Sequence, residues 1–357
     1  MVFNIESGGH VQRIGLWNTA FLGDAVLTLP LLQSLRLRYP DAQIDFYVRK
    51  GLESLFAPNP KINAVYGFDK RGSEKGLSGT KRFADQITRR GYDLWISAHT
   101  SPRSAYMALA SRARIRIGYS SPWWNNLAYT HRVDRRFNEL EEIERLLELL
   151  RPLGEGMISH WPEIFLAEEQ CSIADGIFAS FSTPVLGIHP GSIWPTKRWP
   201  VEFFADIGLK AINHGANVLL FAGIGEEGIA NEVRQRIQQE TGRSEAFRLY
   251  DFSGRLTLPL LAACLSKLSC YLTNDSGPMH IAWSLHTPVT AIFGPTTREL
   301  GFFPRGATST VLEKELFCRP CNLHGPLSCP FEHHNCMRQL FPDYIWNDVR
   351  NKLGYKS

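Results

Sequence analysis

Short apolar segments alternate with amphipathic helical segments along the chain. In the first half the pattern predicts strands at 11–17, 43–48, 94–97 and 116–119. After the first of these strands, apolar residues recur every three positions from 25 to 38, which predicts a helix with one buried face. Strands that alternate with helices form parallel sheets, so this half predicts an α/β domain.

The same alternation begins again at residue 185. Strands are predicted at 185–189, 217–221, 247–249, 270–273 and 289–293, and helices at 201–214, 226–241, 258–267 and 279–285. The stretch 152–162 between the two series contains Pro and Gly and marks a boundary. We therefore predict two doubly wound, Rossmann-like domains, 1–165 and 166–340, facing a central cleft. A terminal helix within 341–357 could pack back on the first domain.

Composition and charge narrow the class of protein. The 357 residues carry a formal net charge of +4, too small to indicate nucleic acid binding by itself. Lys and Arg gather within 71–90 and 103–136, as a solvated basic face or as a surface for an anionic partner such as a phosphorylated glycolipid or membrane. No apolar run approaches the roughly 20 residues of a membrane helix. Residues 1–10 lack the features of a secretory signal, so we expect a cytosolic protein.

The most informative segment is 270–296. An apolar strand runs directly into Asn274, Asp275, Ser276 and Gly277, and a helix begins there. A helix start presents free backbone N–H groups and the positive end of the helix dipole, which suits a phosphate. Asp275 and His280 add hydrogen-bonding groups at the strand end, where ligands bind in open α/β sheets.

Asp24 occupies the corresponding position in the first domain, after the first strand and at the beginning of a helix. One interpretation is a helix N-cap, which is worth about 1 kcal/mol. The other is a general base, since this corner faces the ligand side of an α/β sheet.

Two further loops in the second domain carry polar groups. After the strand at 185–189, the hydroxyls of Ser192 and Thr196 and the ammonium of Lys197 could bind a diphosphate, or the two Trp residues of this loop could simply pack between elements. The loop is not a Walker A sequence. After the strand at 217–221, Glu226 could accept hydrogen bonds from a ribose or could only provide favourable charge at a helix start.

Four cysteines lie close together near the C-terminus: Cys318, Cys321, Cys329 and Cys336. In a cytosolic protein such thiols suggest a metal site more than disulfides. Their spacing differs from common zinc motifs. A structural metal, a redox-sensitive loop and free structural thiols therefore all remain open.

Taken in order, these segments resemble the lipopolysaccharide heptosyltransferases of glycosyltransferase family 9, and most closely the type that adds the second heptose. The resemblance spans roughly residues 12–350. It rests on Gly23-Asp24-Ala-Val-Leu-Thr-Leu-Pro, His189-Pro-Gly-Ser, Thr196-Lys197-Arg-Trp-Pro, Asn274-Asp275-Ser-Gly-Pro-Met-His280 and Cys318-Arg-Pro-Cys321.

The resemblance implies a GT-B fold and a metal-independent, inverting transfer of L-glycero-D-manno-heptose from ADP-heptose to the lipopolysaccharide inner core of a Gram-negative cell. Asp24 would be the catalytic base and Lys197 would stabilise the departing ADP. Asp275 would contact the heptose, Glu226 the ribose, and the backbone of Ser276 and Gly277 the diphosphate. The acceptor would be Kdo-lipid A, reached by peripheral contact at the cytosolic face of the inner membrane.

Two other functions remain open. Some relatives transfer heptose to proteins and hold a cysteine-bound iron near the C-terminus, which the four cysteines here leave possible. A non-catalytic module that binds a nucleotide sugar would use the same second domain. Nucleic acid binding is disfavoured, because the basic residues lack interleaved stacking aromatics.

Overall fold

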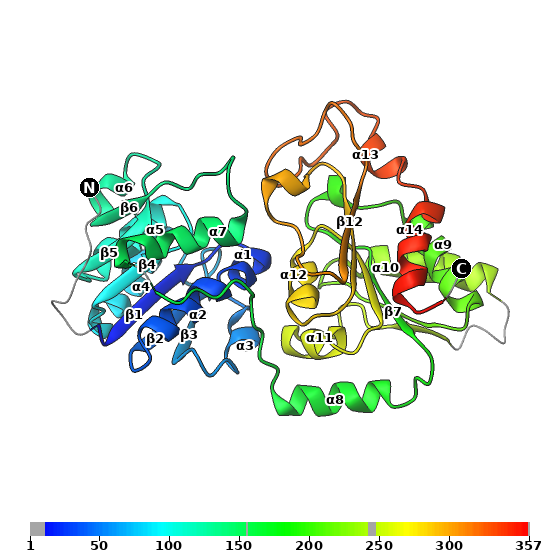
Figure 1. Ribbon diagram of the computed structural model, residues 1–357, viewed down its shortest axis with the longest axis horizontal. Coiled ribbons are helices and arrows are strands. Elements are labelled where there is room, and N and C mark those ends of the chain that lie inside the picture. Colours follow the sequence, from blue (N-terminus) through cyan, green and yellow to red (C-terminus); the bar gives the residue numbers. More distant parts are fainter. Residues whose placement is uncertain (1–10, 155, 242–247, 356–357) are drawn as a thin grey trace. The chain divides into compact units, whose positions relative to one another are not determined.

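The computed structural model describes residues 11–154, 156–241 and 248–355, and its contacts divide the chain into two compact units, Met1–Phe165 and Leu166–Ser357 (Figure 1). Each unit contains one parallel six-stranded sheet with helices. This confirms the predicted α/β fold class. Residues 1–10, for which the sequence predicts no secretory signal, lie outside the described residues.

The sheet of the first unit has the order β3-β2-β1-β4-β5-β6. Its strands are β1 Arg13–Asn18, β2 Gln43–Arg49, β3 Ala64–Phe68, β4 Leu94–Ser97, β5 Ile115–Tyr119 and β6 His131–Val133. Its helices are α1 Leu22–Leu27, α2 Leu29–Arg38, α3 Glu53–Phe56, α4 Gly76–Arg90, α5 Pro102–Ala110, α6 Asn125–Ala128 and α7 Glu142–Leu147, followed by the 3₁₀ helix η1 Glu148–Leu153. The chain order reverses between β1 and β4, so the switch point of this sheet lies there.

The single helix predicted over 25–38 is two helices, α1 and α2, joined at Thr28. Pro30 has no N–H with which to continue the hydrogen-bond ladder of α1, which explains the break. The Thr28 hydroxyl donates to the Asp24 carbonyl oxygen over 2.7 Å, in addition to the Thr28 backbone N–H at 3.1 Å. This bond fixes the end of the turn that carries the Asp24 side chain.

Aromatic side chains dominate one core cluster of the first unit. Trp17 of β1 packs against Tyr47 and Trp95, with ring centroids 5.7 Å and 6.1 Å away. Gly15 leaves the space for Trp95, because a Cβ at Gly15 would lie 2.4 Å from that ring. The close packing holds β1 firmly beside β4 at the switch point.

The sheet of the second unit has the order β12-β11-β10-β7-β8-β9. Its strands are β7 Val185–His189, β8 Asn217–Leu220, β9 Leu249–Asp251, β10 Cys270–Asn274, β11 Val289–Phe293 and β12 Ser309–Glu313. Its helices are α8 Glu168–Phe178, α9 Val201–Asn213, α10 Glu227–Glu240, α11 Leu258–Leu265, α12 Gly277–Ser284, α13 Asn335–Arg338 and α14 Pro342–Lys352, with short 3₁₀ turns η2 Pro195–Lys197 and η4 Arg298–Leu300. The strand predicted at 247–249 begins at Leu249, and residue 247 lies outside the described residues.

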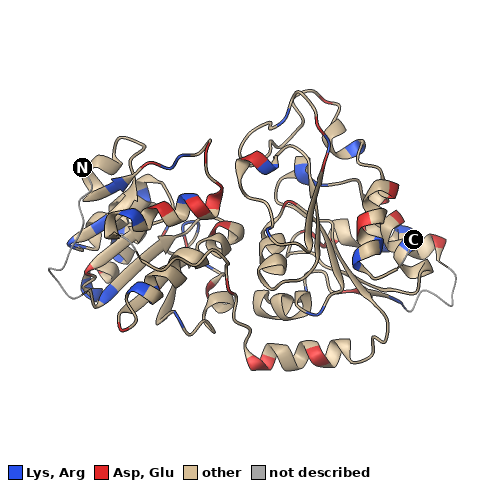
Figure 2. Ribbon diagram, in the orientation of Figure 1, with Lys and Arg blue, Asp and Glu red and all other residues tan. Residues whose placement is uncertain are grey.

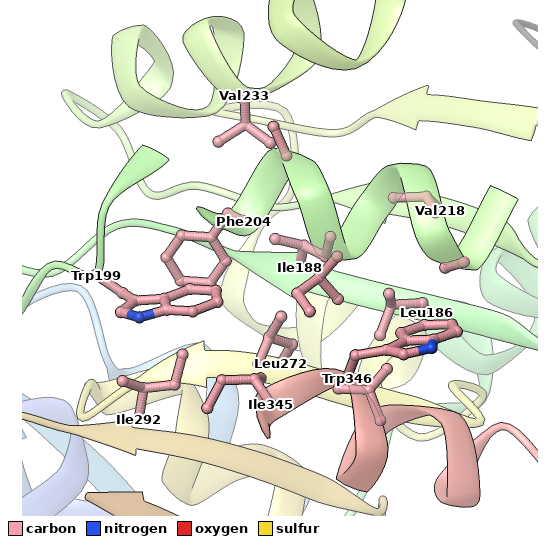
Figure 3. Packing of buried hydrophobic residues seen from close by; sticks show 14 of the residues in the cluster. Leu186, Ile188, Trp199, Phe204, Val218, Val233, Leu272, Ile292, Ile345 and Trp346 are labelled. Carbon is pink, nitrogen blue, oxygen red and sulfur yellow. The ribbon is translucent and has the colours of Figure 1, made fainter. Parts of the chain in front are cut away.

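The C-terminal helix α14 belongs to the core of the second unit. Ile345 and Trp346 of α14 lie in one buried cluster with Ile188 of β7 and Leu272 of β10 (Figure 3). The Trp199 indole donates to the Leu340 carbonyl oxygen over 2.9 Å, just before the helix. Helix α14 therefore packs on α9, β10 and β11 of its own unit. Packing of residues 341–357 on the first domain stays a prediction.

Within the residues that the structure describes, no helix is both long enough and apolar enough to span a membrane.

Candidate functional site

The predicted donor-site residues of the second unit lie at the switch point of its sheet. β7 and β10 are neighbours, and the chain continues from them toward opposite edges of the sheet. Residues 190–197 follow β7 and Asp275 follows β10. Ligands of open α/β sheets bind at this point, beyond the carboxyl ends of the strands.

A buried ion pair forms the centre of this site. The Lys197 ammonium nitrogen lies 2.5 Å from Asp275 Oδ2, and both residues are less than a tenth exposed. The Thr296 hydroxyl, from the loop after β11, donates to the same carboxylate oxygen over 2.7 Å. Three separate strand ends therefore meet at one carboxylate, which holds the ammonium in a fixed position.

Asn274 explains why the loops after β7 and β10 meet so closely. Its Oδ1 accepts the backbone N–H of Trp199 at 3.0 Å, and its Nδ2 donates to the Pro190 carbonyl oxygen at 2.8 Å. One buried amide thus connects both ends of the 190–199 loop to β10. The sequence contained this residue within a recognised motif but did not indicate its bridging role.

Helix α12 begins directly after Asp275, with Ser276 at its N-cap in extended conformation. The first backbone N–H groups of a helix have no partner within it, so this end can bind an anion. His280, one turn into the helix, accepts a hydrogen bond from the Trp283 indole at its Nδ1. Burial lowers the pKa of His280 to about 4, so the imidazole is neutral at pH 7. A neutral buried ring fits a supporting role better than a proton donor.

Glu226 lies beside the end of β7. Its Oε2 is 3.8 Å from His189 Nε2, and its Oε1 is 4.0 Å from Arg198 Nη2. Burial acts to raise the pKa of Glu226, but His189 and Arg198 outweigh it and hold the pKa below its usual value. A Cβ at Gly191 would lie 2.3 Å from the carboxylate, so a larger residue there would displace the Glu226 side chain. Glu226 is therefore an ionised acceptor at the strand end.

The two predicted hydroxyl ligands differ in their surroundings. Thr196 donates its hydroxyl proton to the Pro326 carbonyl oxygen over 2.5 Å, so the hydroxyl is already engaged by the protein. Ser192 is buried, and its carbonyl oxygen accepts from Arg198 Nε at 2.8 Å. Ser192 and Thr196 thus lie in the loop that carries Lys197, and the hydroxyl of Thr196 fixes that loop to Pro326.

In the first unit, Asp24 lies in the first turn of α1, after β1 and its switch point. Its Oδ2 accepts the Phe21 backbone N–H at 3.0 Å. Phe21 is the N-cap of α1 and Asp24 is the third residue of the helix, so Asp24 is not the N-cap that the sequence allowed but bonds back to the N-cap residue. Burial, and secondarily the charge of Glu142, raises the pKa of Asp24 to about 6. The Phe21 N–H and the charge of Arg135 oppose that rise. The carboxylate therefore both stabilises the start of the helix and titrates near neutral pH.

Cations gather around Lys70 in the same unit, and the Lys70 ammonium also feels the charge of Asp24. Burial lowers the pKa of the Lys70 ammonium, and three guanidinium groups near it lower the pKa further: Arg49, Arg71 and Arg103. The charge of Asp24 acts on Lys70 in the opposite direction. Arg49 also lies over the ring of Phe21, 5.7 Å from its centroid. We call Arg49, Lys70, Arg71 and Arg103 the cation cluster; in Figure 2 basic residues lie on several elements of this unit.

Comparisons with known proteins match this architecture. The family model described as "Glycosyltransferase family 9 (heptosyltransferase)" matches residues 80–324. The chain belongs to glycosyltransferase family 9. It is an enzyme of the heptosyltransferase family, as the sequence motifs predicted.

Individual relatives of this glycosyltransferase are similar over nearly the whole chain. Lipooligosaccharide heptosyltransferase 2 of Campylobacter jejuni is 29% identical over 346 residues, which cover 96% of this chain and 98% of the relative. The structure of E. coli ADP-heptose lps heptosyltransferase II matches with a TM-score of 0.78 at 21% identity, covering 96% and 98% of the two chains. E. coli heptosyltransferase WaaC with ADP-2-deoxy-2-fluoro heptose matches with a TM-score of 0.70 at 17% identity, covering 95% and 99%. These structural matches confirm the predicted GT-B fold.

The four C-terminal cysteines of the glycosyltransferase lie near one another. Burial raises the pKa of the Cys336 thiol, and the charges of Cys318, Cys321 and Cys329 raise it further. All seven cysteines are free thiols. Among the residues that the structure describes, no three or more His, Cys, Asp or Glu side chains are grouped so that they could hold a metal ion. The structure therefore does not support a structural metal at Cys318, Cys321, Cys329 and Cys336.

Sequence reasoning missed several residues of the site. Thr296 and Asn274 act through contacts with loops far away along the chain, and no spacing rule relates them to Lys197. In the basic stretch 103–136, Arg116 donates to the Ala128 and Ala113 carbonyl oxygens of the protein itself. The cation cluster had one usable signal, since Lys70 and Arg71 follow β3 at the same edge of the sheet as Asp24.

Proposed function

We propose that this glycosyltransferase transfers L-glycero-D-manno-heptose from ADP-heptose to the inner core of lipopolysaccharide, with inversion at the anomeric carbon. The observation that carries the proposal is the Lys197 ammonium, held by Asp275 beside the start of α12 at the switch point of the second sheet. A fixed cation and a helix N-terminus together suit a diphosphate. Family membership and the ADP-heptose analogue bound by WaaC support the choice of sugar and nucleotide.

On the donor side, departure of ADP develops negative charge on the diphosphate. Lys197 and the backbone N–H groups of Ser276 and Gly277 oppose that charge, and they are already oriented before the reaction begins. Glu226, ionised at the end of β7, suits the ribose hydroxyls as an acceptor. Oδ2 of Asp275 contacts Lys197 and Thr296. Oδ1 is then the oxygen that would accept a hydrogen bond from a heptose hydroxyl.

On the acceptor side, Asp24 removes the proton of the attacking hydroxyl. The acceptor oxygen forms a bond to the anomeric carbon while the bond from that carbon to the ADP oxygen breaks. A carboxylate with a pKa of about 6 is ionised at pH 7 and is basic enough to accept the proton as the bond forms. The cation cluster, whose Lys70 interacts with Asp24, suits the carboxylates and phosphates of an inner-core acceptor.

We further infer a cytoplasmic enzyme with peripheral contact at the cytosolic face of the inner membrane. Helix α5 supports this contact, since Arg103, Tyr106 and Leu109 recur at three-residue spacing along its exposed side. Basic and apolar side chains on one exposed face suit an anionic lipid surface. Arg103 also belongs to the cation cluster, which relates this face to the acceptor site.

Mass spectrometry of reactions with ADP-heptose tests the proposal directly. Two acceptors are compared: Kdo2-lipid A, and the same lipid with one heptose already attached. Gain of one heptose only on the second acceptor is the expected result for an enzyme that adds the second heptose. Gain only on the bare lipid would make it the first transferase of the inner core. No gain on either acceptor, with intact ADP-heptose binding, would contradict the proposed lipid acceptor.

A further inference from the structure

The C-terminal segment 314–341, which contains the four cysteines, is bonded to both loops that carry the donor site. On one side, His334 Nε2 lies 2.7 Å from the Thr196 carbonyl oxygen, and Thr196 in turn donates to Pro326. On the other side, the Cys321 backbone N–H donates to the Pro295 carbonyl oxygen over 2.8 Å. We call residues 314–341 the cysteine segment. Its contacts place it against residues on either side of the Lys197–Asp275 pair.

Arg319 is the centre of the second set of contacts. Its side chain is only 4% exposed, and its Nη2 donates to the Thr296 carbonyl oxygen over 2.7 Å and to Glu313 Oε2 over 2.6 Å. Its Nε donates to the Gly294 carbonyl oxygen, and its Nη1 to that of Lys314 over 2.5 Å. One guanidinium therefore joins the end of β12 to the loop that follows β11.

The same loop residue continues the connection into the donor site. Thr296 is held by Arg319 at its carbonyl oxygen, while its hydroxyl donates to Asp275 Oδ2 over 2.7 Å. That oxygen lies 2.5 Å from the Lys197 ammonium. Each contact in this series involves groups that are largely buried, so a displacement of one is passed to the next.

We propose that Arg319 is a positioning residue of the donor site, which sets the place of the Lys197 ammonium through Thr296 and Asp275. The inference rests on the proposed function, since it assigns Lys197 to the diphosphate. The inference also gives the cysteine segment a role that needs no metal, because the segment holds the loops after β7 and β11 in place through hydrogen bonds. Arginine suits the role because its planar fork donates in several fixed directions at once.

Lysine cannot reproduce this geometry. A lysine at position 319 would keep a positive charge near Glu313, but a single ammonium on a flexible stem cannot hold the Gly294 and Thr296 carbonyl oxygens together. Arg319→Lys is therefore a mild test that preserves charge. Thr296→Val is the second variant, since it removes only the hydroxyl that donates to Asp275 and leaves the contacts of Arg319 in place.

The test measures ADP binding by calorimetry and steady-state kinetics for the full-length protein. We expect both variants to weaken ADP binding and to lower kcat about tenfold or more, because small displacements of a fixed catalytic charge are costly. The KM for the acceptor should stay within about twofold, because the acceptor contacts are untouched. Arg338→Lys, an exposed residue of the same segment, is the matched control and should behave as wild type.

The combined variant separates positioning from stability. If Arg319 acts through Thr296, the double variant should lose little more than either single variant, since both interrupt one series of contacts. Arg319→Lys with a lowered melting temperature but wild-type ADP affinity and kcat would overturn the proposal, because a merely structural residue gives that result. A wild-type protein that binds no ADP would instead refute the proposed donor site, and the inference with it.

Discussion

Asp24 combines a structural and a chemical property in one carboxylate. It accepts the Phe21 N–H at the start of α1, and burial raises its pKa from 3.8 to about 6. Between these two pH values the folded protein binds more protons at this group than the unfolded chain does. The contribution of Asp24 to stability therefore falls as the pH rises through that range. Burial of the ionised Asp24 carboxylate is unfavourable, which fits a functional role for this group better than stabilisation of the helix start alone.

If Asp24 is the base, Asp24→Asn should lower turnover by about 10²-fold or more while ADP affinity is retained. The wild-type rate should also rise with pH along an acidic limb near pH 6, since only the ionised carboxylate accepts a proton. Steady-state kinetics across pH measure both effects. Asp85→Asn, an exposed carboxylate on α4, is the control. Weakened ADP binding with unchanged turnover would contradict the role of Asp24.

Lys197 is expected to act on the leaving group and not on the acceptor. Lys197→Ala should weaken ADP binding and slow transfer by on the order of 10²-fold, because a positioned charge stabilises the departing diphosphate. The variant also leaves the Asp275 carboxylate buried without its cation, so thermal unfolding is measured alongside the kinetics. Lys267→Ala, which removes an exposed ion pair with Asp175, is a matched control. Unchanged kinetics in a folded Lys197→Ala protein would remove Lys197 from the site.

At the scale of elements, the sequence was most informative where strands are fully buried. β7, β10 and β11 were predicted because their residues are apolar on both faces. β3 was missed because its half-buried residues include Gly67, which packs against Glu53. Helix α4 was read only as a basic stretch, although Phe83, Ala84 and Ile87 give it a buried face.

The functional site follows the same division. Asp24, Lys197 and Asp275 could be proposed as site residues because each follows the carboxyl end of a predicted strand. Their roles stay predictions. Thr296 and Arg319 could not be proposed in this way, since their importance arises from contacts between segments that only the folded sheet brings together. Local pattern therefore predicts which loops carry the chemistry, and tertiary contact decides which side chains support them.

Among the helices, α5 is predicted to contact the membrane surface. Tyr106 and Leu109 are 41% and 47% exposed on the same side as Arg103. Wild-type protein should sediment with vesicles of phosphatidylethanolamine and phosphatidylglycerol but not with phosphatidylcholine alone, and added salt should weaken the binding. The double variant Tyr106→Ser, Leu109→Ser should bind those vesicles roughly tenfold more weakly, because it loses the apolar contact.

The control for this experiment is Leu77→Ser, at a leucine that is 92% exposed elsewhere in the same unit. Activity toward an acceptor dispersed in detergent should be the same for wild type, the double variant and the control. Equal vesicle binding by all three proteins would show that α5 is not the contact surface. Loss of activity in detergent would instead place Tyr106 or Leu109 in acceptor binding.

At the scale of the whole molecule, the proposed function assigns acceptor activation to the first unit and donor binding to the second. The first unit holds Asp24 and the cation cluster around its own switch point, and the second holds the Lys197–Asp275 pair around a second one. Each sheet has its own packed core, so each constellation is fixed by the unit that contains it. Donor and acceptor binding should therefore be separable by experiment.

Hydrogen exchange measured by mass spectrometry checks this division. ADP should give its strongest protection at three segments of the second unit, 190–197, 275–279 and 294–297, because these carry the groups that meet at Asp275. Ligand binding slows exchange where it suppresses local opening. Phosphate alone, at matched ionic strength, is the control for screening. Equal or stronger protection by ADP at 21–27, around Asp24, would mean that the nucleotide binds the first unit, and the assignment of donor and acceptor would have to be reversed.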